Sequence, residues 1–291
     1  MSTPARKATG TVSSQDAAGP VGRAAAGNLL GPSFDGVTPV RQPAPPAEPA
    51  VRIEHVGKRF GNGPLVLDDI TLDIAPGEFV CLLGASGCGK STLLNLIAGL
   101  DRPSAGRIET PGAGSAVMFQ ESALMPWLTA RRNVELALRL RGVPRSERRG
   151  KALALLDTVN LADAAEKRPH ELSGGMRQRV ALARALAQDR PVLLMDEPFA
   201  ALDAITRDLL HEELERVWRS TGRTIVFVTH NVREAARLGE RVILLSSRPG
   251  RVAGEWRIAK TAGRRIESPE VAALSIEITD QLRKEIRRNA S

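Results

Sequence analysis

The chain has 291 residues, of which 42% are apolar, enough for a sizeable core in one large or two modest domains. Its net charge of +8 suits nucleic acid or an anionic membrane surface, but aromatic residues make up only 3% and Tyr is absent, so a base-stacking surface has few candidates. No apolar run approaches the roughly 18 residues of a membrane-spanning helix, so the chain is not expected to cross a bilayer by itself.

Residues 1–50 differ in composition from the rest of the chain. They are rich in Ala, Gly, Pro and Ser, and they lack the continuous apolar segment of a secretory signal. Such a composition cannot bury enough apolar surface to offset the entropy of ordering. We therefore expect a disordered tail over 1–50, which is either a dispensable extension or a functional tail, with ordered chain beginning at Val51.

The segment from 51 to 100 combines strand and helix patterns. Residues 51–56 alternate as in a strand, 65–74 form further short strands, and 78–83 form a buried strand that leads into a glycine-rich loop. Apolar residues at helical spacing follow over 91–100. Cys81 and Cys88 lie on either side of the start of this loop, where a disulfide would distort it. Reduced thiols in a cytosolic compartment are expected instead.

The pattern turns helical from Ala123 to about Glu171, with Arg-rich faces and breaks at 142–144 and 168–169. This predicts a helical insertion, at about 121–178, within an α/β domain. Beyond it, a helix, strand, helix and strand are expected over 175–188, 192–195, 205–220 and 224–228, with a last strand over 242–245. The alternation predicts a mostly parallel sheet covered by helices.

The domain is expected to span 51–250, and 251–291 is a C-terminal extension with a short amphipathic helix. Its apolar stripe is expected to dock on the chain's own core, and it consists of Val271, Leu274, Ile278, Leu282 and Ile286.

Residues 84–91, GASGCGKS, match the phosphate-binding pattern G-x-x-x-x-G-K-[ST]. Glycines in this phosphate loop let backbone N–H groups close on phosphate oxygens, and the helix that follows aims the positive end of its dipole at them. Lys90 is expected to reach the β- and γ-phosphates, and the Ser91 hydroxyl to ligate Mg²⁺. The expected binding positions in this segment are Gly84, Ala85, Ser86, Gly87, Cys88, Gly89, Lys90, Ser91 and Thr92.

A second chemical segment is the apolar strand 192–195, which ends in Asp196 and Glu197. Between it and the phosphate loop lies a signature segment, 172–176, that reads LSGGM. This order of three segments resembles one family, the ATP-binding cassette (ABC) ATPases, over roughly 51–250. The resemblance implies ATP hydrolysis with ATP and Mg²⁺, and a P-loop NTPase (RecA-like) α/β core with an antiparallel β subdomain and an inserted α-helical subdomain.

The resemblance also implies roles for single residues. Asp196 would hold Mg²⁺ through water, and Glu197 would polarise the attacking water. His230, at the end of an apolar strand, matches the switch histidine that contacts the γ-phosphate, although Asn231 follows it where the family more often has Asp. Gln120 matches the glutamine that senses Mg²⁺ and joins the helical insertion to the core.

Phe60 occupies the place of an aromatic, commonly Tyr, that stacks on adenine. A core position for Phe60 is the alternative. In the signature segment, Ser173, Gly174 and Gly175 would close on the ATP of a second copy in a head-to-tail dimer, which Asp203 would help to form. Met176 stands where Gln is commoner.

Two further segments, 123–129 and 246–252, resemble the nitrate, aliphatic sulfonate and taurine importers of bacteria. These imply membrane permease subunits, an extracytoplasmic solute-binding protein, a position at the cytoplasmic face of the inner membrane, and no nucleic acid. Trp127 is then either a docking point for the permease or a core residue of the helical insertion. The alternatives are a soluble ABC ATPase acting on nucleic acid or the ribosome, which usually carries a long coiled coil or two cassettes, and an exporter subunit.

Overall fold

Parallel strands form the central sheet, as the alternating pattern predicts. The computed structural model describes residues 48–110, 112, 114–258, 266 and 268–288. Within these, six strands lie in the order β5-β6-β7-β3-β8-β9, and all neighbours are parallel except β9, which runs antiparallel to β8. The strands are β3 Phe79–Gly84, β5 Ser115–Met118, β6 Val192–Asp196, β7 Thr224–Thr229, β8 Arg241–Leu245 and β9 Val252–Arg257.

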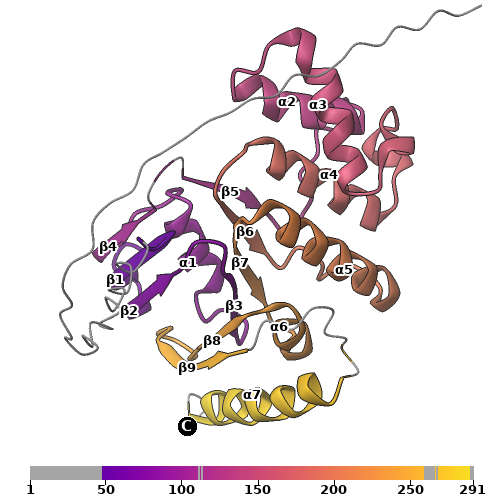
Figure 1. Ribbon diagram of the computed structural model, residues 1–291. Helices are drawn as coiled ribbons and strands as arrows, with labels where there is room; N and C mark the ends of the chain where they lie inside the picture. Colours follow the sequence, from indigo (N-terminus) through magenta and orange to yellow (C-terminus); the bar gives the residue numbers. More distant parts are fainter. Residues whose placement is uncertain (1–47, 111, 113, 259–265, 267, 289–291) are drawn as a thin grey trace, which may run out of the picture. The chain divides into compact units, whose positions relative to one another are not determined.

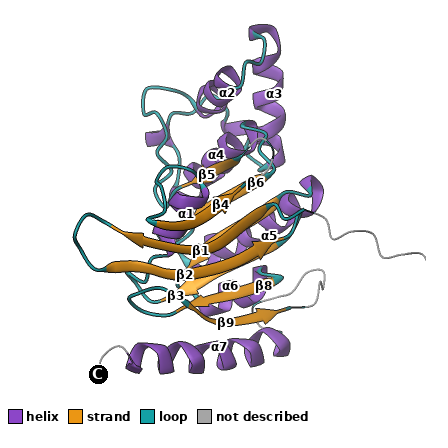
Figure 2. Ribbon diagram, turned by 90° about the vertical axis from the view of Figure 1, so that its left-hand side faces the viewer, coloured by secondary structure: helices purple, strands orange, loops and turns teal. Residues whose placement is uncertain are grey.

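A second, antiparallel sheet has the order β2-β1-β4, as Figure 2 shows. It consists of β1 Val51–Arg59, β2 Leu65–Ile74 and β4 Ala105–Glu109. The segment 65–74 is thus one continuous strand and not several short ones. β1 carries irregularities in its register with both partners, which is why its burial does not alternate regularly.

Three α-helices lie between β5 and β6, together with two short 3-10 helices at Ala162–Ala164 and Pro169–Glu171. The α-helices are α2 Ala130–Leu140, α3 Arg145–Thr158 and α4 Gly174–Ala187, and α2 packs against both others (Figure 1). The predicted breaks are present, since Gly142 has a φ of 87° after α2 and Pro144 precedes α3. The helical prediction was wrong over 123–129, which form a loop.

The remaining helices lie against the central sheet or follow it. They are α1 Lys90–Ile97, α5 Ala204–Thr221, α6 Val232–Leu238 and α7 Pro269–Arg288. In α7, Val271 and Ile278 are buried and Leu274 and Leu282 pack against the core, which confirms that the stripe docks on the chain itself. Ile286 is an exception, because it is exposed, and the helix is longer than predicted.

The pleat of β3 divides the core into two apolar clusters. Phe79, Cys81 and Leu83 belong to the cluster that includes α4 and α5, whereas Val80 and Leu82 belong to the cluster shared with α1 and the antiparallel sheet. All five side chains are buried, so β3 is covered on both faces. Both cysteines are buried and neither is part of a disulfide. The expected tail over 1–50 lies almost entirely outside the described residues.

Candidate nucleotide-binding and hydrolysis site

The segments predicted to bind the nucleotide and to carry out its hydrolysis meet at the carboxyl-terminal edge of the central sheet. In the parallel register Leu83 of β3 lies beside Thr229 of β7, and Asp196 of β6 lies beside Val228 of β7. The carboxyl ends of these strands therefore coincide, and the residues that follow them lie at the place where open α/β sheets carry their sites.

The phosphate loop joins β3 directly to α1. Gly89, the residue before the helix, has a φ of 101°, and a Cβ there would lie 2.6 Å from Leu67 Cδ2, so only glycine fits. Lys90 is buried, and its Nζ donates hydrogen bonds to the carbonyl oxygens of Gly84, at 2.9 Å, and Ala85, at 3.1 Å. The loop thus holds a positive charge on its inner side.

A pocket of about 600 Å³ opens over this loop. Its lining includes predicted residues from four segments, namely Phe60, Ser86, Gly87, Gly89, Lys90, Ser91, Thr92, Gln120, Asp196 and Glu197. Gly84, Ala85 and Cys88 belong to the loop but do not line the pocket. Burial raises the pKa of the Cys88 thiol, so it contributes to packing and not to nucleophilic chemistry.

Oxygen ligands for a cation lie on the floor of the pocket. Ser91 Oγ donates to Asp196 Oδ1 at 3.0 Å, and Gln120 lines the same space. Burial raises the pKa of Asp196, and the hydrogen bond from Ser91 acts in the opposite sense. Hydroxyl, carboxylate and amide oxygens suit Mg²⁺, which usually takes one or two protein carboxylates together with substrate phosphates and water. The site fits Mg²⁺ on that chemistry.

Glu197 and His230 form a pair beside these ligands. Glu197 Oε2 lies 2.8 Å from His230 Nδ1, and the Glu197 backbone N–H donates to Val228 O at 3.0 Å. Glu197 has a φ of 44°, an uncommon conformation for a residue with a side chain. Glu197 lines the pocket from this turn.

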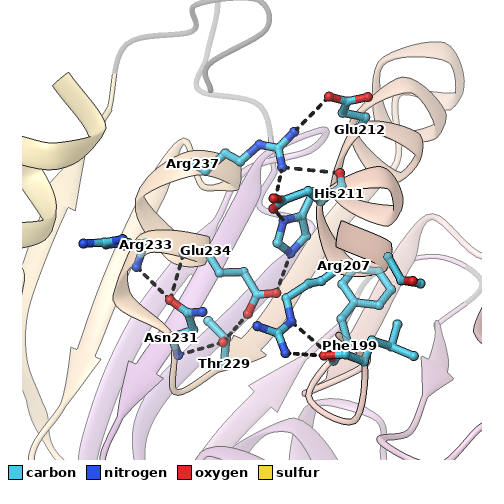
Figure 3. A network of polar contacts seen from close by, with 12 residues as sticks. Phe199, Arg207, His211, Glu212, Thr229, Asn231, Arg233, Glu234 and Arg237 are labelled. Atoms are coloured by element: carbon cyan, nitrogen blue, oxygen red, sulfur yellow. Dashed lines mark hydrogen bonds and ion pairs between the residues drawn. The ribbon is translucent and has the colours of Figure 1, made fainter. Parts of the chain in front are cut away.

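A buried polar network supports the turn that carries His230 (Figure 3). Glu234 accepts a hydrogen bond from the Thr229 hydroxyl and pairs with His211 Nε2 at 2.5 Å. Asn231 Oδ1 accepts from the backbone N–H groups of Arg233, at 3.0 Å, and Glu234, at 3.3 Å, and so caps α6. The amide oxygen of Asn231 thus supplies the acceptor that an Asp would supply.

Phe60 lies at the other end of the pocket and is 53% exposed, which excludes the core position. The Lys58 ammonium lies 4.7 Å from the centroid of its ring and donates to Asp101 Oδ1 at 2.8 Å. Lys58 therefore holds the ring in place on one side. The exposed ring is available for stacking, which stays a prediction.

Comparison with known proteins identifies the family. The ABC transporter family profile matches residues 67–200. The taurine import ATP-binding protein TauB of Rhizobium johnstonii is 47% identical over 247 residues, 78% of this chain and 94% of that protein. The chain belongs to the ABC transporter ATP-binding proteins. The nitrate import ATP-binding protein NrtD of Synechocystis sp. is 49% identical over 210 residues, 70% of this chain and 78% of that protein.

Solved ABC cassettes share the fold. A dimeric post-hydrolysis structure of the ATP-binding cassette MJ0796, bound to ADP and Pi, matches with a TM-score of 0.62 and 35% identity, and covers 72% of this chain and 100% of that chain. A second dimeric structure of MJ0796, described as a bacterial ABC transporter cassette, matches with a TM-score of 0.63. These confirm the predicted P-loop cassette fold, and the chain is an ATP-binding, ATP-hydrolysing ABC subunit.

The signature segment of this ABC cassette does not line the pocket of its own chain. Ser173 caps α4, because its Oγ accepts from the Met176 backbone N–H at 3.2 Å. A Cβ on Gly175 would lie 2.5 Å from Thr206 Cγ2, so this glycine also permits close packing of α4 on α5. Asp203 caps α5 through Thr206 N at 2.9 Å, and that hydrogen bond holds the pKa of Asp203 below its usual range.

Sequence reasoning missed two sets of residues at this ABC site. Gln178 and Arg184 on α4 donate to the carbonyl oxygens of Gln120, at 2.8 Å, Ser122, at 2.7 Å, and Ala123, at 2.6 Å, and so tie the loop after β5 to the signature helix. The pocket also includes residues of the β1–β2 turn, the start of β2 and the loop after β8, namely Gly63, Pro64, Leu65, Val66 and Arg248. Only tertiary structure brings these residues to the site.

Proposed function

We propose that the chain is the nucleotide-binding subunit of a bacterial ABC importer that energises uptake of a small oxyanion-type solute, such as taurine, an aliphatic sulfonate or nitrate, through a separate permease. The support for an import role is the taurine and nitrate import proteins among its relatives, at 44–49% identity. The observation that carries the catalytic part is the pocket that gathers Lys90, Ser91, Asp196 and Glu197.

In this proposal each part of the pocket binds one part of Mg²⁺-ATP. Phe60 stacks on adenine, and Lys90 leaves the loop carbonyls to pair with the β- and γ-phosphates. Ser91, Gln120 and Asp196 hold the metal, directly or through water. When bound, Mg²⁺ neutralises charge on the phosphate oxygens.

Hydrolysis depends on the Glu197–His230 pair. Glu197 accepts a hydrogen bond from the attacking water and aligns it with the γ-phosphorus, so that the water attacks in line. The bond from the water oxygen to phosphorus forms as the bond to the bridging oxygen of ADP breaks, and the products are ADP, inorganic phosphate and a proton. His230, whose Nδ1 donates to Glu197 Oε2 at 2.8 Å, orients that carboxylate and lies beside the γ-phosphate. The uncommon backbone of Glu197 fixes the direction of the carboxylate before the nucleotide arrives.

The site is completed by a second copy of the chain. Because Ser173, Gly174 and Gly175 do not line the pocket of their own chain, they are free to close on the nucleotide of a partner, with Asp203 at the interface. The solved structures of MJ0796 are dimeric, which supports a dimer of this chain. ATP then joins the two copies, and its hydrolysis loosens them.

The permease contact is assigned to the loop that carries Trp127. This side chain is 68% exposed, so the core interpretation was wrong. Asn133, which is fully buried, accepts from the Met125 N–H at 2.8 Å and donates to Thr129 O at 3.0 Å, and so holds the loop in one shape. No helix among the described residues has the length and apolar character to cross a membrane. We place the subunit at the cytoplasmic face of the inner membrane through this contact, with a solute-binding protein on the other side.

The experiment for the hydrolytic assignment is Glu197→Gln, with Glu147→Gln on the surface of α3 as the matched control. The first variant should bind ATP normally and lose more than about tenfold in hydrolysis rate, or roughly 1.4 kcal/mol of barrier, because the carboxylate that polarises water is gone. In ATP it should also shift from monomer to dimer in light scattering. A smaller loss would contradict the role of Glu197, and monomer at every ATP concentration would contradict the dimer.

A further inference from the structure

The loop that follows β8 has a fixed shape. Ser246 N–H donates to Arg251 O at 2.8 Å, and the Ser246 hydroxyl donates to Pro249 O at 2.9 Å and accepts from Arg251 N–H at 2.9 Å. Three hydrogen bonds across six residues close the segment 246–251 on itself. It belongs to the second segment that the sequence singled out and that the hydrolytic mechanism does not use.

This loop is fixed against both the antiparallel sheet and the phosphate loop. Gly250 N–H donates to Val66 O at 2.8 Å, and Asp68 N–H donates to Gly250 O at 3.0 Å. A Cβ on Gly250 would lie 2.3 Å from Cys88 O, so the two backbones are in direct contact and no other residue fits there. The position of the loop relative to the phosphate loop is therefore set by backbone contacts.

Arg248 projects from this loop over the middle of the phosphate loop. Its Nε donates to Gly87 O at 3.1 Å, and a Cβ on Gly87 would lie 3.1 Å from Arg248 Nη2, so the guanidinium lies close against the Gly87 backbone. Arg248 lines the pocket together with Ser86 and Lys90. Within the part of the chain that the structure describes, the Gly87 carbonyl is its one recorded hydrogen-bond partner and no carboxylate pairs with it.

Arg251, three residues after Arg248 in the same loop, is paired with a carboxylate. Its guanidinium forms an ion pair with Asp68, with Nε at 2.8 Å from Oδ2, and it does not line the pocket. The loop thus carries two guanidinium groups. The Arg251 guanidinium is neutralised by Asp68, whereas Arg248 keeps its terminal N–H groups available for a ligand in the pocket.

We propose that Arg248 is a further nucleotide-binding residue, whose terminal N–H groups contact the phosphates of the bound nucleotide. A guanidinium presents several donors in a planar fork that suits phosphate oxygens. The bond from Nε to Gly87 orients that fork in advance, so less side-chain entropy is lost on binding. Together with Lys90 it places two cations on the phosphate chain. The inference rests on the assignment of the pocket to ATP.

The test is isothermal titration calorimetry of ATP and ADP with Arg248→Gln, and with Arg251→Gln as the matched control. Gln can still donate to Gly87 O, but it lacks the charge and the fork. We expect Arg248→Gln to weaken ATP binding about tenfold or more, and ADP binding less, because ADP carries less charge. Arg251→Gln should bind ATP within about twofold of the wild type, since its cation faces Asp68 and not the pocket.

Reference variants separate this inference from the assignment of the pocket. Lys90→Ala should abolish tight ATP binding, and if it and Arg248→Gln both bind like the wild type, the pocket itself is misassigned. If only Arg248→Gln binds like the wild type, or if Arg251→Gln loses as much, the role of Arg248 is overturned. Arg248→Lys restores the charge without the fork and should recover part of the loss. Equal losses in the Gln and Lys variants, with a lowered melting temperature of the ligand-free protein, would show that Arg248 only supports Gly87.

Discussion

At the scale of a residue, Asp196, the carboxylate proposed to hold Mg²⁺, lowers the stability of the ligand-free chain. Burial raises its pKa, so the folded chain binds a proton on this carboxyl more readily than the unfolded chain does. The contribution of Asp196 to the free energy of unfolding therefore falls as the pH rises from its ordinary pKa to the raised pKa of the folded chain. At neutral pH this contribution remains unfavourable. The Ser91 hydroxyl offsets only part of this effect.

We expect Asp196→Asn to raise the melting temperature of the ligand-free protein at pH 7 by roughly 2–4 °C, or about 1 kcal/mol, because it keeps the shape and removes the buried charge. The gain should disappear near pH 3, where the wild-type carboxyl is protonated. Differential scanning calorimetry in the presence of a metal chelator measures the melting temperatures at both pH values. Asp203→Asn is the matched control, because the pKa of Asp203 is lowered and its amide should give no gain. Equal gains in both variants would contradict the explanation.

At the scale of elements, α5 connects the turns that carry Glu197 and His230. His211 on α5 pairs with Glu234, which holds Thr229 just before His230, and the His211 ring lies 5.6 Å from that of Phe199, close after Glu197 (Figure 3). His211 is fully buried. One helix thus supports the turn after β6 and the turn after β7 together, without lining the pocket.

His211→Leu should therefore destabilise the chain by about 2–4 kcal/mol, because the buried Glu234 carboxylate loses its partner. Urea unfolding measures this loss. ATP affinity should be nearly unchanged, while the hydrolysis rate falls several-fold as the His230 turn loosens. Adding Glu234→Gln to His211→Leu removes the unpaired charge and should recover part of the stability. No recovery in the double variant would contradict the proposed pairing.

Local patterns predicted most of these elements but not all of them. The phosphate loop, the strand before Asp196 and the strand before His230 carry strong local signals, and the structure brings their ends together. The helix α6 was missed because it has only seven residues. The strand β4 was missed because its residues are mostly exposed, so its sequence shows no alternation of apolar and polar residues. The sequence singled out the segment that contains Arg248 only by its resemblance to importers, and its place at the pocket could not be predicted because it depends on how Gly250 packs on Cys88.

At the scale of the whole molecule, the surfaces that matter are those that a single chain leaves open. The signature segment does not line the pocket of its own chain, so in the proposed dimer a second copy would supply it, and the loop that carries Trp127 is the proposed contact for the permease. The loop after β5, which leads to Trp127, is also linked to α4, the helix that follows Ser173. Gln178 and Arg184 of α4 donate hydrogen bonds to backbone carbonyl oxygens of this loop. If the proposed permease moves this loop, α4 should move with it, which would couple transport to closure of the proposed dimer.

Trp127→Ala tests that connection. It should leave folding and ATP binding intact, because Trp127 is exposed and lies outside the pocket while Asn133 still holds the loop. If the loop docks on a permease, loss of the aromatic anchor should cost about 2 kcal/mol or more of association. Solute uptake in cells should then fall, while the isolated subunit keeps its basal ATPase rate.

Leu140→Ala is the control for Trp127→Ala, because Leu140 is an apolar side chain at the other end of α2 that is 81% exposed. It should leave association and uptake unchanged, since it lies roughly 15 Å further along the helical segment. Copurification of each variant with the permease, scored beside uptake, separates docking from catalysis. A Trp127→Ala protein that copurifies and transports normally would show that the permease contacts another part of the chain, and a fall in both variants alike would point to a general loss of apolar surface.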